Sequence, residues 1–482
     1  MLLLALFLLL QSHVINAQQS LSFEKVFNFT AKSLPNPPIF SLPPARANVS
    51  ISVALCASSP SLPQFFISND TSITQPGQGD VGSGRVFEIT LENGFGAWSG
   101  LVSDGGFLTI SGAVQVPIEI GISEHGPLHE VLDGLPLLGD TTSNQALVFS
   151  HPISYSNTTQ IEDPTYPNYV LPPANISFPS GAPALPIDVT LFVASTSSPE
   201  LASLPHTGCA IRAANIKGSQ LLATDQTPDN GLWLRDSEGW RWQWLFTGLT
   251  PLTNYTTYVV ENGTKVSGPV NFVTKSASFS CHLVHSLPYC PSVNYAVPLN
   301  APPSRIPSYT SLNLPSEITD PLLEVLTNFT ISLSTQACGR DNYSPLVSCA
   351  DCQRAYRAWL CSIWFTRCAD AAPTSTSTSE TAAATAKVTP ATQVQLATET
   401  PRSPGLPPFP FDYTVLLPCL ETCTAADRAC PYFLGFKCPL PKFTAQQSYG
   451  VGYVDHGEEG TKGKGSTGVT QDRWGNVWCN GV

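Results

Sequence analysis

The sequence predicts a β-rich N-terminal region followed by a disulfide-rich, mainly α-helical C-terminal domain. Apolar residues recur at every second position along the first part of the chain, as they do in strands with one buried face. Only 12% of the 482 residues are charged and 44 are proline, a composition that favours short strands and loops over long charged helices. Twelve of the 14 cysteines follow residue 280, so the second part of the chain is the part that disulfides stabilise.

Residues 1–17 have the pattern of a secretory signal peptide. Residues 2–10 form an apolar run that is too short for the ~20 residues of a bilayer span, and Ala17 is a small residue at a suitable cleavage point. No later apolar run approaches 18 residues, and the last 33 residues are polar and glycine-rich. We therefore expect entry into the secretory pathway, with no spanning segment and no lipid-anchor tail.

Cysteines and glycosylation motifs agree with secretion. An oxidising compartment pairs an even number of cysteines, here Cys56, Cys209, Cys281, Cys290, Cys338, Cys349, Cys352, Cys361, Cys368, Cys419, Cys423, Cys430, Cys438 and Cys479. The Asn-x-Ser/Thr acceptor pattern occurs nine times, at Asn28, Asn48, Asn69, Asn157, Asn175, Asn254, Asn262, Asn328 and Asn342. The sequence thus predicts a glycosylated, disulfide-bonded protein.

Residues 21–180 are expected to form an antiparallel β-sandwich. Apolar residues alternate with others over residues 49–55, 87–91 and 114–122, so each run presents one apolar face. The segments between them are rich in Gly, Pro and Ser, as in residues 74–84, which is typical of connections in all-β domains.

Residues 181–277 are expected to form a second sandwich. An alternating strand covers residues 186–195, and the motif Leu249-Thr-Pro251-Leu-Thr253-Asn-Tyr255 resembles the tyrosine corner of fibronectin type III domains, in which the Tyr hydroxyl bonds to nearby backbone. Trp242 and Trp244 share one strand face, which favours a place in the core over a sugar-stacking platform. Cys56 and Cys209 are the only cysteines of the β-rich region, so we expect them to pair and to join the two sandwiches.

Residues 278–482 are expected to form the cysteine-rich helical domain. The pair Asp320-Pro321 is a good helix start, and residues 350–368 lack Gly and Pro and place Cys361 and Cys368 two helical turns apart. Cys419, Cys423 and Cys430 are likewise spaced by whole helical turns, which would place them on one helix face. Residues 371–410, rich in Ser, Thr, Ala and Pro without apolar periodicity, are expected to be a disordered insertion.

Several chemistries are disfavoured. A net charge of −12 argues against nucleic-acid binding, which needs clustered Lys and Arg. Cys281, His282, His285 and Cys290 have zinc-ligand chemistry, and Cys349-x-x-Cys352 has redox spacing, but disulfides explain the cysteines of a secreted chain better.

Enzymatic and calcium-loop motifs are weak as well. Gly121-Ile-Ser123-Glu-His125 has His where a nucleophile elbow needs Gly, and paired carboxylates of a glycosidase cannot be located by spacing. Residues 455–459 lack the spacing of a calcium loop. The sequence predicts no enzyme and no cofactor.

The cysteine-rich part resembles a known family. The segments Cys349-Ala-Asp-Cys352, Trp359-Leu-Cys361, Arg367-Cys368, Pro418-Cys419-Leu-Glu-Thr-Cys423, Arg428-Ala-Cys430-Pro431 and Phe436-Lys-Cys438-Pro439 follow one another as in the fungal stretch-activated calcium channel component, the mating-pheromone-induced-death protein family. This part is also similar to the frizzled-type cysteine-rich domain of the auxiliary subunit of the animal sodium-leak channel.

The resemblance implies a regulatory subunit of a high-affinity calcium uptake system. Its partner would be a large four-repeat, voltage-gated-type channel subunit, which would hold the chain at the extracellular face of the plasma membrane or in the endoplasmic reticulum. A chain without a spanning segment would not itself form the pore, because backbone polar groups in lipid must be paired within helices or closed barrels. The alternative is a secreted cell-wall or carbohydrate-binding glycoprotein.

Overall fold

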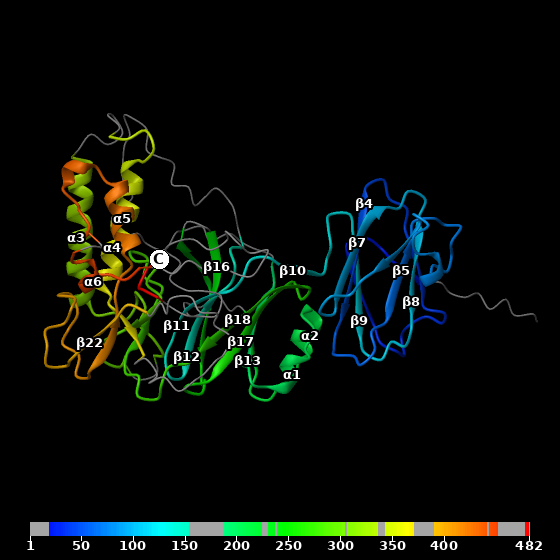
Figure 1. Cartoon of the computed structure of the whole chain (residues 1–482), viewed down its shortest axis with the longest axis horizontal. Helices are drawn as coiled ribbons and strands as arrows, with labels where there is room; N and C mark the ends of the chain where they lie inside the picture. The colour runs from blue at the N-terminus through cyan, green and yellow to red at the C-terminus, as the bar shows by residue number, and fades with distance from the viewer. Residues whose placement is uncertain are drawn as a thin grey trace, which may run out of the picture.

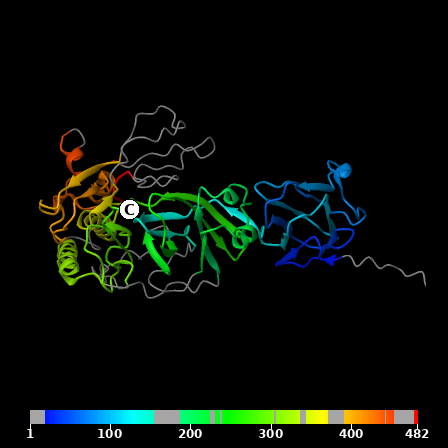
Figure 2. The ribbon, with the colours of Figure 1, turned by 90° about the horizontal axis from the view of Figure 1, so that it is seen from below.

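The computed structural model describes residues 19–153, 187–223, 230–236, 239–303, 306–335, 343–370, 390–440, 443–451 and 478–481. The predicted signal peptide lies outside these residues. The molecule is elongated: an N-terminal pair of sheets lies at one end, further sheets in the middle and the long helices at the other end (Figures 1 and 2). The chain is therefore β-rich first and helical later, as predicted.

The N-terminal unit consists of two sheets around one core. One sheet has the strand order β1-β3-β8-β5-β6 and the other β2-β9-β4-β7. Their strands are β1 Gln19–Ser20, β2 Lys25–Phe29, β3 Ile39–Leu42, β4 Asn48–Leu55, β5 Gln64–Ser68, β6 Val86–Ile89, β7 Phe95–Leu101, β8 Gly106–Ser111 and β9 Ile118–Ser123, with the 3-10 helix η1 Gln78–Asp80. The alternating residues of β4 and β9, such as Val53 and Ile120, have no exposed surface and fill this core. Residues 114 and 116, predicted to begin the last strand, precede it but still pack on the core.

The middle unit also has two sheets, in the orders β10-β18-β17-β13-β14 and β11-β12-β16-β15. Its elements are β10 Glu130–Leu132, β11 Leu137–Thr141, β12 Gln145–Phe149, β13 Val189–Ser195, α1 Pro199–Ala202, α2 Gly208–Ala213, β14 Gln220–Ala223, β15 Leu232–Asp236, β16 Gly239–Thr247, β17 Asn254–Glu261 and β18 Lys265–Val273. Strands β10–β12 precede residue 180, yet β10 pairs with β18, β12 pairs with β16 and β11 pairs with β12, so none of them joins a sheet of the first unit. The sheets therefore change well before the expected boundary, because alternation defines a strand's faces but not its partners.

The aromatic residues of β16 are core residues. Trp242, Trp244 and Phe246 are at most 3% exposed, so Trp242 and Trp244 offer no surface for stacking on a sugar. The Tyr255 hydroxyl accepts a hydrogen bond from the backbone N–H of Thr250 at 2.9 Å. This is the bond that the tyrosine-corner motif predicts.

A disulfide between Cys56 and Cys209 joins the N-terminal and middle units, the pairing that the sequence predicts. Beside it, the Thr207 hydroxyl donates to the Leu55 carbonyl at 2.6 Å, and the His206 N–H donates to the Asn93 carbonyl at 2.9 Å. Covalent and hydrogen-bonded contacts thus hold the two units together at α2.

The C-terminal part combines helices with short strands. Its elements are β19 His282–Val284, β20 Tyr295–Val297, α3 Ser316–Ser334, α4 Cys349–Trp364, β21 Arg367–Ala369, β22 Thr392–Gln395, β23 Tyr413–Leu416, α5 Leu420–Ala429, η3 Tyr432–Leu434 and α6 Ala445–Ser448. Helices α3 and α4 pack around Leu322, Leu326 and Leu360. Strands β21, β23 and β22 form a small antiparallel sheet beside the helices (Figure 1).

Two helix predictions are wrong in detail. Helix α3 begins at Ser316 rather than at Asp320, and Pro321 lies inside it. Proline has no backbone N–H, so Pro321 removes one hydrogen bond near the start of the helix. Pro315 is the N-cap residue, and its φ of −57° suits that position. Helix α4 ends at Trp364, where Phe365 leaves helical geometry, so Cys368 lies on β21 and not two turns beyond Cys361 on one helix face.

The insertion expected at residues 371–410 is ordered in its second half. Residues 371–389 lie outside the described part, but Thr392–Gln395 is strand β22, paired with β23. Leu406 and Phe409 are 5% exposed and belong to two core clusters. These two apolar residues anchor a proline-rich segment whose composition alone indicated disorder.

A buried cluster of charges joins the middle unit to the C-terminal part. The Asp140 carboxylate on β11 accepts hydrogen bonds from Lys275 Nζ at 2.9 Å and from Arg367 Nε at 3.2 Å. It also accepts the backbone N–H of Ala296 at 3.0 Å, so strands β11, β20 and β21 meet at one carboxylate. Burial by itself would raise the pKa of Asp140, but the charges of Arg367 and Lys275 hold this pKa below its ordinary value.

We predict that Asp140→Asn lowers the free energy of unfolding by about 3–5 kcal/mol, because it leaves two buried cations without their counter-charge. Chemical denaturation of the purified chain measures this loss. The matched control is Asp70→Asn, which breaks the exposed Asp70–Arg85 pair and should change stability little. Equal effects of the two substitutions would contradict a special role for the buried cluster.

Candidate functional site

The helical domain is the candidate site for a protein partner, and disulfides determine its shape. Among the described long helices, α4 and α5 carry cysteines that bond to other segments of the chain, whereas α3 contains no cysteine. The described disulfides of this domain are Cys281–Cys368, Cys290–Cys361, Cys352–Cys430, Cys419–Cys479 and Cys423–Cys438. Cys349 is also disulfide-bonded, and Cys338 lies outside the described residues.

The disulfide pairing does not bring together the residues of the zinc and redox alternatives in the way that either chemistry requires. Cys281 and Cys290 bond to different cysteines, and the His285 ring nitrogens lie 2.9 Å from the Ser286 hydroxyl and 2.8 Å from the Ser308 hydroxyl. Cys352 bonds to Cys430 and not to Cys349. Within the described residues, the two groups with three potential metal ligands each consist of a disulfide and one glutamate, and disulfide sulfurs lack the thiolate that metals prefer.

A Ser-His-Glu arrangement that the sequence analysis missed occurs in the N-terminal unit. His129 Nδ1 lies 2.9 Å from the Ser52 hydroxyl, and His129 Nε2 lies 3.1 Å from the Glu119 carboxylate. Ser52 has no exposed surface and also accepts the His129 backbone N–H, so the hydroxyl is out of a substrate's reach. The group fixes the segment after β9 to strand β4. The Ser123 oxygen likewise accepts the backbone N–H of His125, and Ser123 is buried.

Glycosylation motifs lie mainly at the surface. The described acceptor asparagines Asn28, Asn48, Asn254, Asn262 and Asn328 are exposed, and Asn69 is half-buried. Asn157, Asn175 and Asn342 lie outside the described residues, as does the acidic stretch at residues 455–459. Modification of these asparagines stays a prediction.

Large apolar side chains are exposed in the helical domain. Tyr432 in η3 is 92% exposed, Leu346 before α4 is 89% exposed and Phe443 before α6 is 75% exposed. Two residues before Tyr432, Cys430 forms a disulfide with Cys352 that ties the end of α5 to α4. Rigidly held, exposed aromatic residues are typical of protein-binding surfaces.

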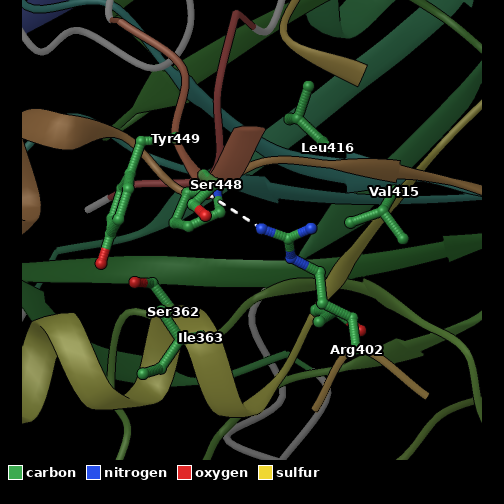
Figure 3. A pocket seen from close by; sticks show the side chains of 9 residues that line it. Ser362, Ile363, Arg402, Val415, Leu416, Ser448 and Tyr449 are labelled. Atoms are coloured by element: carbon green, nitrogen blue, oxygen red, sulfur yellow. Dashed lines mark hydrogen bonds between the residues drawn. The ribbon is translucent and has the colours of Figure 1, made fainter. Parts of the chain in front are cut away.

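A cavity of about 190 Å³ lies between the end of α4 and strand β23. Ser362 and Ile363 line one side and Val415 and Leu416 another, while the Arg402 guanidinium reaches between them to Ser448 (Figure 3). Arg402 donates from Nη1 to Gln393 Oε1 at 2.8 Å and from Nη2 to the Ser448 carbonyl at 3.1 Å. Burial lowers the pKa of Arg402, although the nearby Tyr449 and Tyr413 partly oppose this.

Within the described part of the chain, no helix combines the length and the apolar character that crossing a bilayer requires.

Comparison with known proteins identifies relatives over most of the chain. The profile of the Mid1 family, "Stretch-activated Ca2+-permeable channel component", matches residues 48–464. A stretch-activated cation channel MID1 of Cryptococcus neoformans is 35% identical over 83% of this chain and 70% of its own length.

More distant relatives match a smaller part. Stretch-activated cation channel yam8 of Schizosaccharomyces pombe is 31% identical over 43% of this chain, and the MID1 protein of Saccharomyces cerevisiae is 30% identical over 43%. These matches span only 40% and 37% of the two yeast proteins. Among solved structures, the FN1–FN3 domains of chicken CNTN1 align with 54% of this chain and 69% of theirs at 10% identity and a TM-score of 0.17, a similarity too weak to define the fold.

We predict that the double variant Cys290→Ser/Cys361→Ser is not exported. Removing a native disulfide from a small secreted domain costs about 2–5 kcal/mol, a large share of its stability. Immunoblots of cell-surface and intracellular fractions measure the effect, and removal of the surface pair Asp351–Arg354 by Arg354→Gln is the control. Wild-type levels of the double variant at the cell surface would contradict the role given to this disulfide.

His285 predicts a pH dependence of stability. Complete burial lowers the pKa of His285 to about 4, against 6.5 for the free side chain. The unfolded chain therefore binds this proton first as the pH falls from 6.5 to 4, and stability decreases over that window by up to about 3 kcal/mol. Above pH 6.5 the imidazole is neutral in both states and contributes no slope.

Denaturant titrations at several pH values measure this slope in the wild type and in His285→Gln. Gln retains hydrogen-bonding groups toward the neighbouring hydroxyls but does not titrate, so the variant should lose this part of the slope. Identical slopes for both proteins would show that other groups cause the acid sensitivity.

Proposed function

The chain belongs to the Mid1 family of stretch-activated Ca²⁺-permeable channel components, and on this premise we propose that it is an extracytoplasmic regulatory subunit of a calcium channel. The family match over residues 48–464 carries this proposal. The subunit docks on a large four-repeat pore subunit and supports calcium influx. Binding to this partner holds it at the plasma membrane or endoplasmic reticulum.

The described sheets and helices support an accessory role rather than a pore. Both sheet pairs enclose cores that side chains fill, such as fully buried Phe40 in the first and Trp244 in the second. Closely packed cores of this kind leave no path for a hydrated ion.

The helical domain provides the docking surface in this proposal. Leu346, Tyr432 and Phe443 are its exposed apolar residues, and the disulfide Cys352–Cys430 attaches the segment of Tyr432 to α4 before binding, which reduces the entropy lost on association. The partner supplies the apolar surface that covers them.

The finer fold assignment is part of the same proposal. The N-terminal and middle sheet pairs are β-sandwiches, the second of them fibronectin type III-like, as the Tyr255 bond supports. The disulfide-bonded helices form a frizzled-like domain. The alternative of a carbohydrate-binding wall glycoprotein has less support, because the strand-face tryptophans are buried.

We predict that affinity purification of a C-terminally tagged chain from mild-detergent membranes recovers a very large multi-span channel polypeptide, identified by mass spectrometry. The variant Leu346→Ser/Tyr432→Ser should reduce this recovery several-fold, since exposed apolar anchors contribute most to binding. Leu62→Ser/Val81→Ser, which changes exposed residues of the N-terminal unit, is the matched control.

Secretion of the tagged wild type into medium or cell wall without a channel polypeptide would contradict the subunit function and favour the glycoprotein alternative. Equal loss of the channel from both double variants would contradict the docking surface but not the function.

A further inference from the structure

The cavity beside Arg402 has a chemistry that the proposed function does not use. It is built from four separate segments: the end of α4, the loop before β23, β23 itself and the end of α6. The disulfides of Cys361, Cys368 and Cys419 flank two of these segments in the sequence, the end of α4 and β23, and attach them to other parts of the domain. A cavity held in this way is formed before any ligand arrives.

Arg402 is half-buried and has no acidic partner in the described part of the chain. Its two hydrogen bonds both go to neutral oxygens, on Gln393 and Ser448. By contrast, Arg85, Arg354 and Arg367 each pair with a carboxylate, although Arg85 and Arg354 are far more exposed. A guanidinium has five N–H donors, so Arg402 retains donors for a further acceptor.

The other polar groups of the cavity also suit an anionic oxygen. The Tyr449 hydroxyl accepts a hydrogen bond from Trp359 Nε1 at 2.9 Å, which leaves its own hydrogen to donate. Val415 and Leu416 supply an apolar wall, as the methylene groups of an acidic side chain require.

Size and charge decide the class of ligand. A volume of about 190 Å³ corresponds to about six water molecules and is smaller than the roughly 300–1,000 Å³ of pockets for drug-sized ligands. One guanidinium balances one negative charge, and its planar fork matches a carboxylate. The cavity thus fits a single acidic side chain.

We propose that the Arg402 cavity binds the carboxylate of a glutamate or aspartate side chain presented by a partner polypeptide. The carboxylate pairs with the Arg402 guanidinium and accepts the Tyr449 O–H, while its methylene groups contact Val415 and Leu416. The inference rests on the proposed function only for the identity of the partner.

The test titrates the purified full-length chain with acetyl-glutamate amide and with acetyl-glutamine amide, its neutral isostere, by saturation-transfer NMR at low ionic strength. The acidic probe should bind at least about tenfold more tightly, because a hydrogen bond to a charged group exceeds one to a neutral group. Arg402→Gln should abolish this preference. Arg402→Lys should retain part of it, since a lysine keeps the charge but loses the fork.

Arg85→Gln is the control for removal of an arginine elsewhere, and circular dichroism of each variant checks folding. Equal binding of both probes, unchanged binding to Arg402→Gln or absence of binding to the wild type would overturn the proposal. Binding that appears only after Asp455, Glu458 and Glu459 are neutralised would also overturn it, by assigning the cavity to this chain's own acidic residues.

The probe measurement involves no channel. Failure to recover a channel polypeptide would therefore contradict the proposed function without changing the outcome at the cavity, and a failed titration would leave the proposed function unchanged.

Discussion

The buried carboxylate of Asp140 is the contact on which the arrangement of the molecule depends. It receives Lys275 from the end of the middle unit and Arg367 from the strand that follows helix α4. Arg367 also donates to the Gly139 carbonyl at 3.0 Å, and Lys275 donates to the Cys368 carbonyl at 3.3 Å. Because an unpaired charge in this position is costly, other placements of the helical domain against the sheets are disfavoured. The cluster specifies an orientation more than it adds stability.

Disulfides extend this constraint to the rest of the chain. Cys281–Cys368 lies beside the Asp140 cluster, and its two cysteines belong to the apolar core that Phe149 and Leu245 of the middle unit also enter. At the other end of the molecule, Cys56–Cys209 links the N-terminal unit to the middle unit covalently. Without this disulfide, hydrogen bonds alone would attach the N-terminal unit through a small contact. Each unit has only a limited core of its own. The covalent links at both contacts between units compensate for the limited stability that such cores provide.

The sequence predicted those features that depend on local pattern. Alternation identified the strands that contain Val53 and Ile120, the corner motif identified the Tyr255 bond, and an isolated pair of cysteines identified Cys56–Cys209. Apart from this pair of cysteines, partners distant in the sequence were beyond reach. Nothing near Asp140 signals that Arg367 will lie against it, and twelve cysteines allow too many pairings to choose among. The Arg402 cavity was missed for the same reason, since its four walls come together only in the folded chain.

Rigidity and exposure are combined in the helical domain in a way that suits a regulatory subunit. A force or a conformational change in a partner is transmitted through a domain only if that domain does not deform first. Cys361 links α4 to the loop between β19 and β20, Cys368 links β21 to the residue before β19, and Cys419 links the start of α5 to Cys479, and these links reduce such deformation. The Asp140 cluster then connects the same strands to the sheets of the middle unit. In the proposed regulatory role, these contacts would carry a load on the helices to the β-rich region through the Asp140 cluster.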